Sequence, residues 1–422
     1  MLACSRRRHT ATILGDLAVI EACKGRTRCT SPTASPEDLM ALPLPRTYVD
    51  VHILQTVPPA NLNRDDQGNP KEAYYGGVRR SRVSSQAWKR ATRVHFTERV
   101  PEQDLATRTR RINGALADKI ADRTGLDTEA SARLAGALLA PLKISAGKKE
   151  GDTAYLFFYG HRQLDDVAAL IHDRAAELAA LDDTELAAEI KQLPVQEKFS
   201  TSHPMDVALF GRMVADIPAL NVDAATQVAH ALSTHAVELE FDYFTAVDDE
   251  TKKGEETGAG MIGTIGFNSA TLYRYASVGL HQLSRNLTDQ EAAVTAVEEF
   301  VTSFARSMPT GYGNSFAHRT LPSLVAVVVR DDQPVNLVSA FEEPVATSSG
   351  IAAASARRLA REYATATRAW GDAPAFTSLC HTFTDSGQTT ELLSDTFGEA
   401  VTFPQLLAGL RTYLTDAVKQ AA

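Results

Sequence analysis

A short segment of the chain concentrates side chains that could bind phosphate. Residues 61–100 contain nine basic and four acidic residues, so the segment has a net charge of +5 although the whole chain carries −9. Its basic residues are Arg64, Lys71, Arg79, Arg80, Arg82, Lys89, Arg90, Arg93 and Arg99. A basic segment on an acidic protein indicates a local site for an anionic partner rather than a general solubility device.

Part of this charge falls on a helix that the sequence predicts over residues 85–99. One face carries Gln86, Lys89, Arg90 and Arg93, spaced i, i+3, i+4 and i+7, and we call these four residues the basic stripe. The opposite face carries Ala87, Trp88, Ala91, Val94 and His95, which we expect to pack against the protein. The helix therefore presents the basic stripe to a partner.

The start of the same helix adds groups that attract phosphate. Ser84 and Ser85 lie at its N-terminus, where free backbone N–H groups and the helix dipole favour anions. Gly76 and Gly77 would let a ligand approach the backbone closely. The alternative is a solvated amphipathic helix with ordinary surface arginines. Because the stripe, the helix start and the basic run before it converge, we favour a site for a phosphate backbone.

Other residues that could do chemistry give weaker signals. Asp65 and Asp66 could hold a metal ion for nuclease chemistry, but adjacent carboxylates usually point apart and more often pair with neighbouring arginines. His230 and His235 miss the i, i+4 spacing of a zinc-binding helix. We therefore expect no catalytic residue, no metal site and no cofactor.

Length and composition restrict the class of protein. The 422 residues suffice for two or three domains, and 44% hydrophobic with 23% charged residues is typical of a globular chain. No run approaches the ~18 apolar residues of a membrane span, so we expect no membrane partner. Three of the four cysteines lie near the N-terminus, too widely spaced for a zinc knuckle. Such cysteine usage indicates a reducing compartment, and we expect a cytoplasmic protein.

The N-terminal stretch differs from the rest of the chain. Three arginines precede a broken apolar patch, and residues 30–36 are rich in Ser, Thr and Pro. This pattern is a poor signal peptide and resembles a linker; a targeting arm or an over-called start codon are the alternatives. We predict that residues 1–46 are an extension, disordered or outside the fold, and that residues 47–422 form the folded part.

Strands and helices interleave along residues 47–422. Alternation predicts half-buried strands over residues 48–56 and 237–244, and a continuous apolar run predicts a buried strand over 324–329. A capping box at Thr288 and Glu291 predicts a helix that ends before Pro309. Other helices are predicted near residues 102–123, 128–143, 161–180, 183–192, 350–369 and 404–420. The pattern indicates an α+β fold with helices on one side of the sheet and long insertions.

The basic segment resembles a known family. Its residues Asn63 to Asp66, Lys71, Gly76-Gly77, Arg79 to Gln86 and Lys89-Arg90 are similar to the signature of the CasC backbone protein of type I-E CRISPR Cascade surveillance complexes. Gly211 to Met213, Phe244 to Asp249 and Tyr273 to Ala276 support the resemblance, which spans residues 48–340. After the Pro309 turn, the family usually has a cation where this chain has Tyr312 in a short Gly-Tyr-Gly loop, which we expect to be flexible.

The resemblance implies a fold and a set of partners. The fold would be a modified ferredoxin-like, RNA-recognition-motif-like palm with a helical fingers insertion at about 100–200 and a β-hairpin thumb at about 205–262. The partners would be guide crRNA, target DNA that pairs with the guide, other copies of the chain in a filament, and other Cascade subunits. The chain would bind crRNA through backbone contacts that carry no sequence information and would catalyse nothing itself.

The resemblance also implies roles for individual residues. The RNA-binding set is Arg64, Lys71, Arg79, Arg80, Ser84, Gln86, Lys89, Arg90 and Arg93. Met213, Phe244 and Thr245 would wedge against bases from the thumb, which is the chemistry that unstacking needs. Ordinary core packing is the alternative for Met213 and Phe244.

Two other functions remain open from the sequence. A metal-dependent ribonuclease would use Asp65 or Asp66 and would cut complementary RNA at regular intervals. A transcriptional regulator would need a recognition-helix pattern, and the sequence shows none.

Overall fold

The computed structural model describes residues 46–144, 147–149, 151–214, 217–246, 261–346, 350–384 and 387–421. The predicted extension, apart from Arg46, therefore lies outside the described residues. Within the described ranges, no helix is both long and apolar enough to cross a bilayer.

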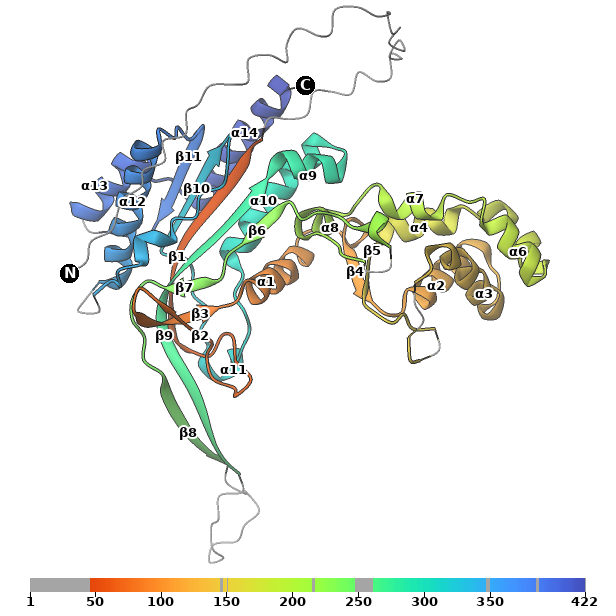
Figure 1. The fold of residues 1–422 in the computed structure, drawn as a ribbon, viewed down its shortest axis with the longest axis horizontal. Helices are drawn as coiled ribbons and strands as arrows, with labels where there is room; N and C mark the ends of the chain where they lie inside the picture. The colour runs from red at the N-terminus through yellow and green to blue at the C-terminus, as the bar shows by residue number, and fades with distance from the viewer. Residues whose placement is uncertain are drawn as a thin grey trace, which may run out of the picture. The chain divides into compact units, whose positions relative to one another are not determined.

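The structure is a mixed α/β fold built on an antiparallel sheet. The strands are β1 (Tyr48–Ala60), β2 (Glu72–Tyr75), β3 (Val78–Val83), β4 (Ala106–Thr109), β5 (Phe157–Gly160), β6 (Thr226–Val228), β7 (Ala231–Ser233), β8 (Glu240–Ala246), β9 (Met261–Gly279), β10 (Leu324–Arg330) and β11 (Phe376–His381). The main sheet has the order β11-β10-β1-β9-β7-β3-β2, with β6 and β8 also paired to β9 (Figure 1). The strands β4 and β5 form a separate pair.

The helices form three groups around these strands. Their bounds are α1 (Ser85–Thr97), α2 (Ile112–Thr124), α3 (Thr128–Leu139), α4 (His161–Ala169), α5 (Ala175–Ala180), α6 (Asp183–Ile190), α7 (Val195–Ser200), α8 (Met205–Phe210), α9 (Leu280–Leu287), α10 (Gln290–Arg306), α11 (Gly313–Phe316), α12 (Ile351–Trp370), α13 (Gln388–Phe397) and α14 (Phe403–Ala421). Most predicted helices are present, but the one expected over 102–123 begins at Ile112, because residues 106–109 pair with β5 as a strand.

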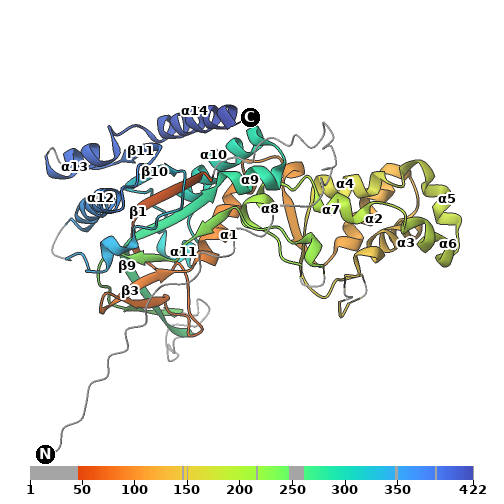
Figure 2. The same ribbon diagram turned by 45° about the horizontal axis from the view of Figure 1, so that its top comes forward.

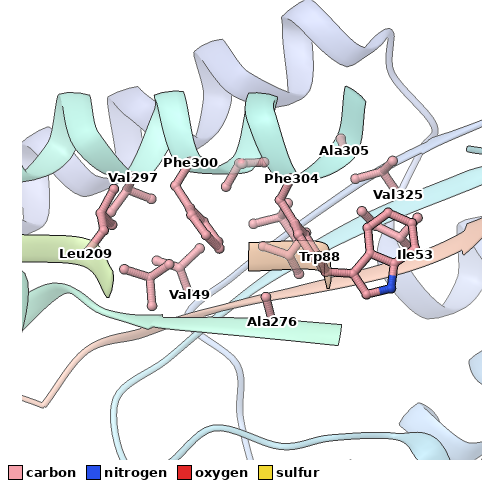
Figure 3. Packing of buried hydrophobic residues seen from close by; sticks show 14 of the residues in the cluster. Val49, Ile53, Trp88, Leu209, Ala276, Val297, Phe300, Phe304, Ala305 and Val325 are labelled. Atoms are coloured by element: carbon pink, nitrogen blue, oxygen red, sulfur yellow. The ribbon is translucent and has the colours of Figure 1, made fainter. Parts of the chain in front are cut away.

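One face of the main sheet packs against α1, α9, α10 and α14. Phe300 and Phe304 of α10 project onto Val49 and Ile53 of β1, and Trp88 of α1 joins them in the same cluster (Figure 3). All five side chains are fully or almost fully buried. Burying an aromatic or aliphatic side chain of this size contributes about 1.5–3 kcal/mol, so this layer fixes α1 on the sheet.

The other face of the sheet is also covered, which corrects the expectation of helices on one side. Leu54 and Tyr273 pack there with Leu359 of α12 and Phe397 of α13. Figure 1 draws α12 and α13 across the strands from α10. The strand β1 is therefore buried on both faces, including Asp50 and His52, and was wrongly expected to be half-buried.

The polar side chains of β1 are buried in a hydrogen-bonded network. Asp50 accepts a hydrogen bond from the Tyr275 hydroxyl at 2.8 Å and lies 3.3 Å from the Arg330 guanidinium. The His52 imidazole lies 2.9 Å from the Tyr273 hydroxyl. Alternation along β1 cannot reveal these partners, because they come from β9 and β10 far along the chain.

The helices α2 to α7 gather around a core of their own (Figure 2). Leu116, Leu134, Leu164 and Phe199 are fully buried in it. This helical insertion follows α1 in sequence and is joined to the β4–β5 pair. Its helices run from Ile112 to Ser200, whereas the sequence predicted helices from about 102 to 192 and did not predict α7.

A long hairpin is the least covered part of the described sheet. The strand β8 pairs with the first part of β9, from Glu240 opposite Phe267 to Ala246 opposite Met261 (Figure 1). Its side chains from Glu240 to Thr245 are exposed on both faces, so the expectation of a half-buried strand is wrong here. We call this element the β8–β9 hairpin.

The helix α10 begins differently from its prediction. Its N-cap is Asp289, whose carboxylate accepts a hydrogen bond from the Ala292 N–H at 3.0 Å. Thr288 instead ends α9 in a left-handed conformation, with φ 55°. The one-residue shift follows from α9, which the sequence did not reveal and whose C-cap is Thr288.

Candidate nucleic-acid interface

The helix α1 is anchored by the face opposite its basic stripe. Trp88, Thr92 and Phe96 are buried, and the His95 imidazole lies 3.1 Å from the Ser303 hydroxyl of α10. Val94 is 51% exposed, so the prediction that it packs inward is wrong. The buried positions repeat at i, i+4 and i+8, which turns the inward face slightly away from Val94.

The basic stripe itself is accessible to different degrees. Gln86 and Arg90 are exposed, whereas Lys89 and Arg93 are half-buried. Partial burial lowers the pKa of Lys89 and of Arg93, because a charged group loses hydration there. Such partly dehydrated cations gain more from a phosphate than fully hydrated ones do.

Arg93 also links α1 to the helical insertion. Its guanidinium lies 5.2 Å from the centre of the Phe158 ring, which Arg108 approaches at 4.7 Å. Asp206 is buried nearby and accepts the Ala106 N–H at 3.0 Å. Burial raises the pKa of Asp206 to about 6, although the charge of Arg93 opposes that rise. Arg93 is therefore both a stripe residue and a support of the β4–β5 pair.

The structure gives Ser84 a different role from the predicted one. Ser84 is the N-cap of α1: its hydroxyl accepts the Ala87 N–H at 3.3 Å, and its side chain is buried. Its own N–H donates to the Asn63 side chain at 2.9 Å. A direct phosphate contact by the Ser84 side chain is therefore replaced by a capping contact that fixes the start of α1.

The structure also gives Arg80 a different role from the predicted RNA contact. It is 0% exposed, and its guanidinium donates to the carbonyl oxygens of Ser233 at 3.0 Å and Phe341 at 2.8 Å. Arg79, on the alternate face of β3, is exposed and pairs with Glu72 at 3.1 Å. Because neighbouring residues of a strand face opposite ways, only Arg79 can meet a ligand from solution.

The loop before β2 brings the remaining predicted contacts beside β3. Arg64 is exposed and Lys71 is half-buried, with the Lys71 N–H bonded to the Asn63 carbonyl at 2.8 Å. Asp65 folds the loop, because its carboxylate accepts the N–H groups of Gln67 and Asn69, each at 2.9 Å. No group of three His, Cys, Asp or Glu side chains that could hold a metal occurs among the described residues.

Met213 and Phe244 lie on different parts of the molecule. Met213 is 84% exposed and follows α8, beside Arg212, whose guanidinium donates to the Phe158 and Phe199 carbonyls. Phe244 and Thr245 lie on the β8–β9 hairpin. Figure 1 draws α8 and β8 well apart. The placement of Met213 on the same hairpin is therefore wrong, and so is the alternative that it packs in the core.

Phe244 lies over a glycine of the opposite strand. Its ring is 37% exposed, and a Cβ added to Gly263 would come within 2.3 Å of it. Phe241 and Tyr243 are 60% and 63% exposed on the same strand. Large exposed aromatic side chains on a bare hairpin indicate an interaction surface. The prediction missed Phe241 and Tyr243, although their alternation with acidic residues marked them.

The sequence did not reveal two buried arginines that support the interface. Arg274 of β9 lies 3.7 Å from the centre of the Trp88 ring and 4.6 Å from that of Phe304, holding α1 against α10. Arg212, next to Met213 in sequence, donates to the Phe158 and Phe199 carbonyls. Arg212 lies in the motif at 211–213 and Arg274 in the motif at 273–276. Because both are charged, nothing in the sequence indicated that they would be buried.

Comparisons with known proteins identify a family and similar solved chains. A model of the family described as CT1975-like protein matches residues 49–408. One similar solved chain, from a CRISPR RNA-guided surveillance complex, pre-nicking, is 33% identical with a TM-score of 0.73, covering 87% of this chain and 100% of that one. Another, from a CRISPR RNA-guided surveillance complex, is 29% identical with a TM-score of 0.65, covering 87% and 99%. No curated protein matches.

Proposed function

The chain belongs to the CT1975-like protein family, and we propose from this premise that it is a backbone subunit of a CRISPR RNA-guided surveillance complex. In this role it coats guide crRNA and leaves the bases free to pair with target DNA. The observation that carries the proposal is the basic stripe on α1, which is held outward by the buried Trp88 and Phe96. Contacts of this kind bind the RNA backbone and accept any guide sequence.

Such a subunit would need a palm, fingers and a thumb, and three elements of the fold suit these roles. We assign the palm to the main sheet with its two helical layers, the fingers to the helical insertion, and the thumb to the β8–β9 hairpin. The palm would then bind RNA through α1, β3 and the loop at 61–71, which are consecutive or paired in the structure.

The separation of Met213 from Phe244 favours assembly of several copies. If both side chains wedge against the same bases, one subunit cannot supply both, because they lie on different parts of the chain. A neighbouring copy would bring its hairpin to the Met213 of the next. An exposed apolar side chain on each of the two surfaces suits such a shared site.

We propose that the subunit has no catalytic activity. Asp65, one of the two candidates of the ribonuclease alternative, uses its carboxylate to order its own loop. Incubation of the assembled complex with complementary RNA and Mg²⁺ tests this directly. Intact RNA is the expected result, and regularly spaced cuts that disappear in Asp65→Asn or in Asp66→Asn would establish the ribonuclease.

The proposed role is tested by purifying the chain from cells that carry a CRISPR locus and sequencing the RNA bound to it. We expect repeat-derived guides with unrelated spacers. A variant with Lys89→Ala and Arg90→Ala should recover much less of that RNA, whereas Lys191→Ala should not. Recovery of random cellular RNA in proportion to its abundance would contradict the proposal.

A further inference from the structure

The loop after α10 is fastened to the interface, contrary to the flexible loop that its glycines suggested. Gly311 packs so closely on the loop at 61–62 that an added Cβ would lie 2.5 Å from the Asn61 carbonyl oxygen. Farther on, the buried His318 imidazole lies 3.0 Å from the Pro309 carbonyl oxygen. Between Pro309 and His318 lies the short helix α11, with Phe316 against Phe267 of β9 at 5.8 Å between ring centres.

Tyr312 stands in this fastened loop in an unfavourable backbone conformation. Its φ is 49°, a left-handed value that costs energy for a residue with a side chain. Its ring meets Phe316 edge-on at 6.4 Å between ring centres, which restricts its orientation. A strained aromatic residue that the surrounding packing holds in place is typical of a functional position.

The Arg64 guanidinium lies over the face of the Tyr312 ring. The guanidinium carbon lies 4.6 Å from the ring centre, within the range of a cation–π contact. Arg64 is exposed, and among the described residues it forms no ion pair with a carboxylate. The nearest acid in sequence, Asp65, directs its carboxylate to backbone N–H groups. The cation is thus positioned, and no carboxylate of the described residues pairs with it.

We propose that Tyr312 is a positioning residue that orients the Arg64 guanidinium for a forked contact with an RNA phosphate. This inference rests on the proposed function and adds a residue to its binding site. A guanidinium held by its face on an aromatic ring keeps its edge donors free, and two parallel N–H groups match a phosphate. Tyr312 supplies no charge itself, so it acts only through Arg64.

The contribution of Tyr312 is therefore conditional on Arg64. Without the ring, Arg64 keeps its charge but loses its fixed orientation, which a cation–π contact on a surface stabilises enough to change affinity about two- to fivefold. Without Arg64, the ring has nothing to orient. The cation–π contact needs only the face of the ring, so phenylalanine should replace tyrosine.

The experiment measures crRNA affinity and its salt dependence for Tyr312→Leu, Tyr312→Phe, Arg64→Ala and the double variant Arg64→Ala/Tyr312→Leu, using the full chain. Tyr312→Leu should weaken binding about two- to fivefold, and Tyr312→Phe should bind like the wild type. Arg64→Ala should lower the log–log salt slope by about 0.7, and adding Tyr312→Leu to it should change nothing more. Arg361→Ala, on α12, serves as the control for loss of an exposed arginine.

The double-variant comparison decides between positioning and a merely structural role. Equal weakening by Tyr312→Leu with and without Arg64 would overturn the proposal, and so would wild-type affinity in Tyr312→Leu. If Tyr312→Leu fails to fold, the proposal is decided by Arg64→Lys, which keeps the charge without the fork and should bind more weakly than the wild type. Failure of the wild-type chain to bind RNA would instead overturn the proposed function.

Discussion

Arg80 and Arg90 belong to the same basic segment, yet one is buried among carbonyl groups and the other is exposed. The sequence predicts the helix, its basic stripe and the strand before it, because these depend on local spacing. It does not predict the burial of Arg80, because the carbonyls that bind Arg80 lie at Ser233 and Phe341. Likewise, the stacking of Arg64 on Tyr312 joins segments that only the fold brings together.

Replacing Arg80 should therefore lower stability, whereas replacing Arg90 should weaken RNA binding. Arg80→Met leaves several buried carbonyl groups without a donor, so we expect a loss of about 3 kcal/mol or more in the free energy of unfolding. Arg90→Met should change that free energy by less than about 0.5 kcal/mol but should weaken RNA binding. Urea unfolding of both variants measures the first effect. Equal stability of the two would show that Arg80 is not a structural residue.

Replacing Lys89 tests whether the basic stripe binds RNA. Lys89→Ala should lower the log–log salt slope of RNA binding by about 0.7, the effect of one lost contact with a single strand. Lys191→Ala removes an exposed lysine from the helical insertion and should leave the slope unchanged. The slope is measured from dissociation constants at several salt concentrations. The same slope in wild type and Lys89→Ala would place the RNA elsewhere.

Among the strands of the described residues, β8 of the β8–β9 hairpin is unusual because its side chains from Glu240 to Thr245 are exposed on both faces. Alternation predicted its first strand but also predicted a buried face, and the long strand β9 was missed because its glycines and polar residues obscure the pattern. A hairpin covered by a helix could have a similar alternation of apolar and polar residues, so the alternation does not predict whether the hairpin is exposed. Exposure of Phe241, Tyr243 and Phe244 is therefore a property that only the fold reveals.

The hairpin should act on pairing rather than on stability. Phe244→Ala should leave the melting temperature almost unchanged, because the ring packs on Gly263 outside the core, and should impair capture of target DNA. Gly263→Ala should impair it similarly by displacing the ring. Phe304→Ala, in the core, should instead cost about 3–5 kcal/mol of stability. A large loss of stability in Phe244→Ala would mean that the ring is structural.

The junction of α8 with the β4–β5 pair should depend on pH through Asp206. Its pKa is about 6 in the folded protein, above the ordinary 3.8, so the folded chain binds more protons than the unfolded chain between these values. Stability should therefore fall as pH rises from 4 to 6, by up to about 3 kcal/mol. In Asp206→Asn this part of the dependence should vanish. Parallel curves of unfolding free energy against pH for the two proteins would contradict it.

The whole molecule, in the proposed role, would act as many copies on one RNA. The β8–β9 hairpin and Met213 are exposed and lie on different parts of the molecule, and a single subunit would leave both without partners. Repetition along a strand would bring each hairpin to the next copy. The sequence can imply this arrangement only through resemblance, because contacts between copies leave no local pattern.

The most direct test is the mass of the assemblies that form on RNAs of increasing length and unrelated sequence. The account predicts that the number of bound copies rises in equal steps with RNA length and is the same for different sequences of one length. It also predicts fewer copies for the variant with Lys89→Ala and Arg90→Ala. One copy per RNA at every length, or a number that depends on sequence, would contradict the account.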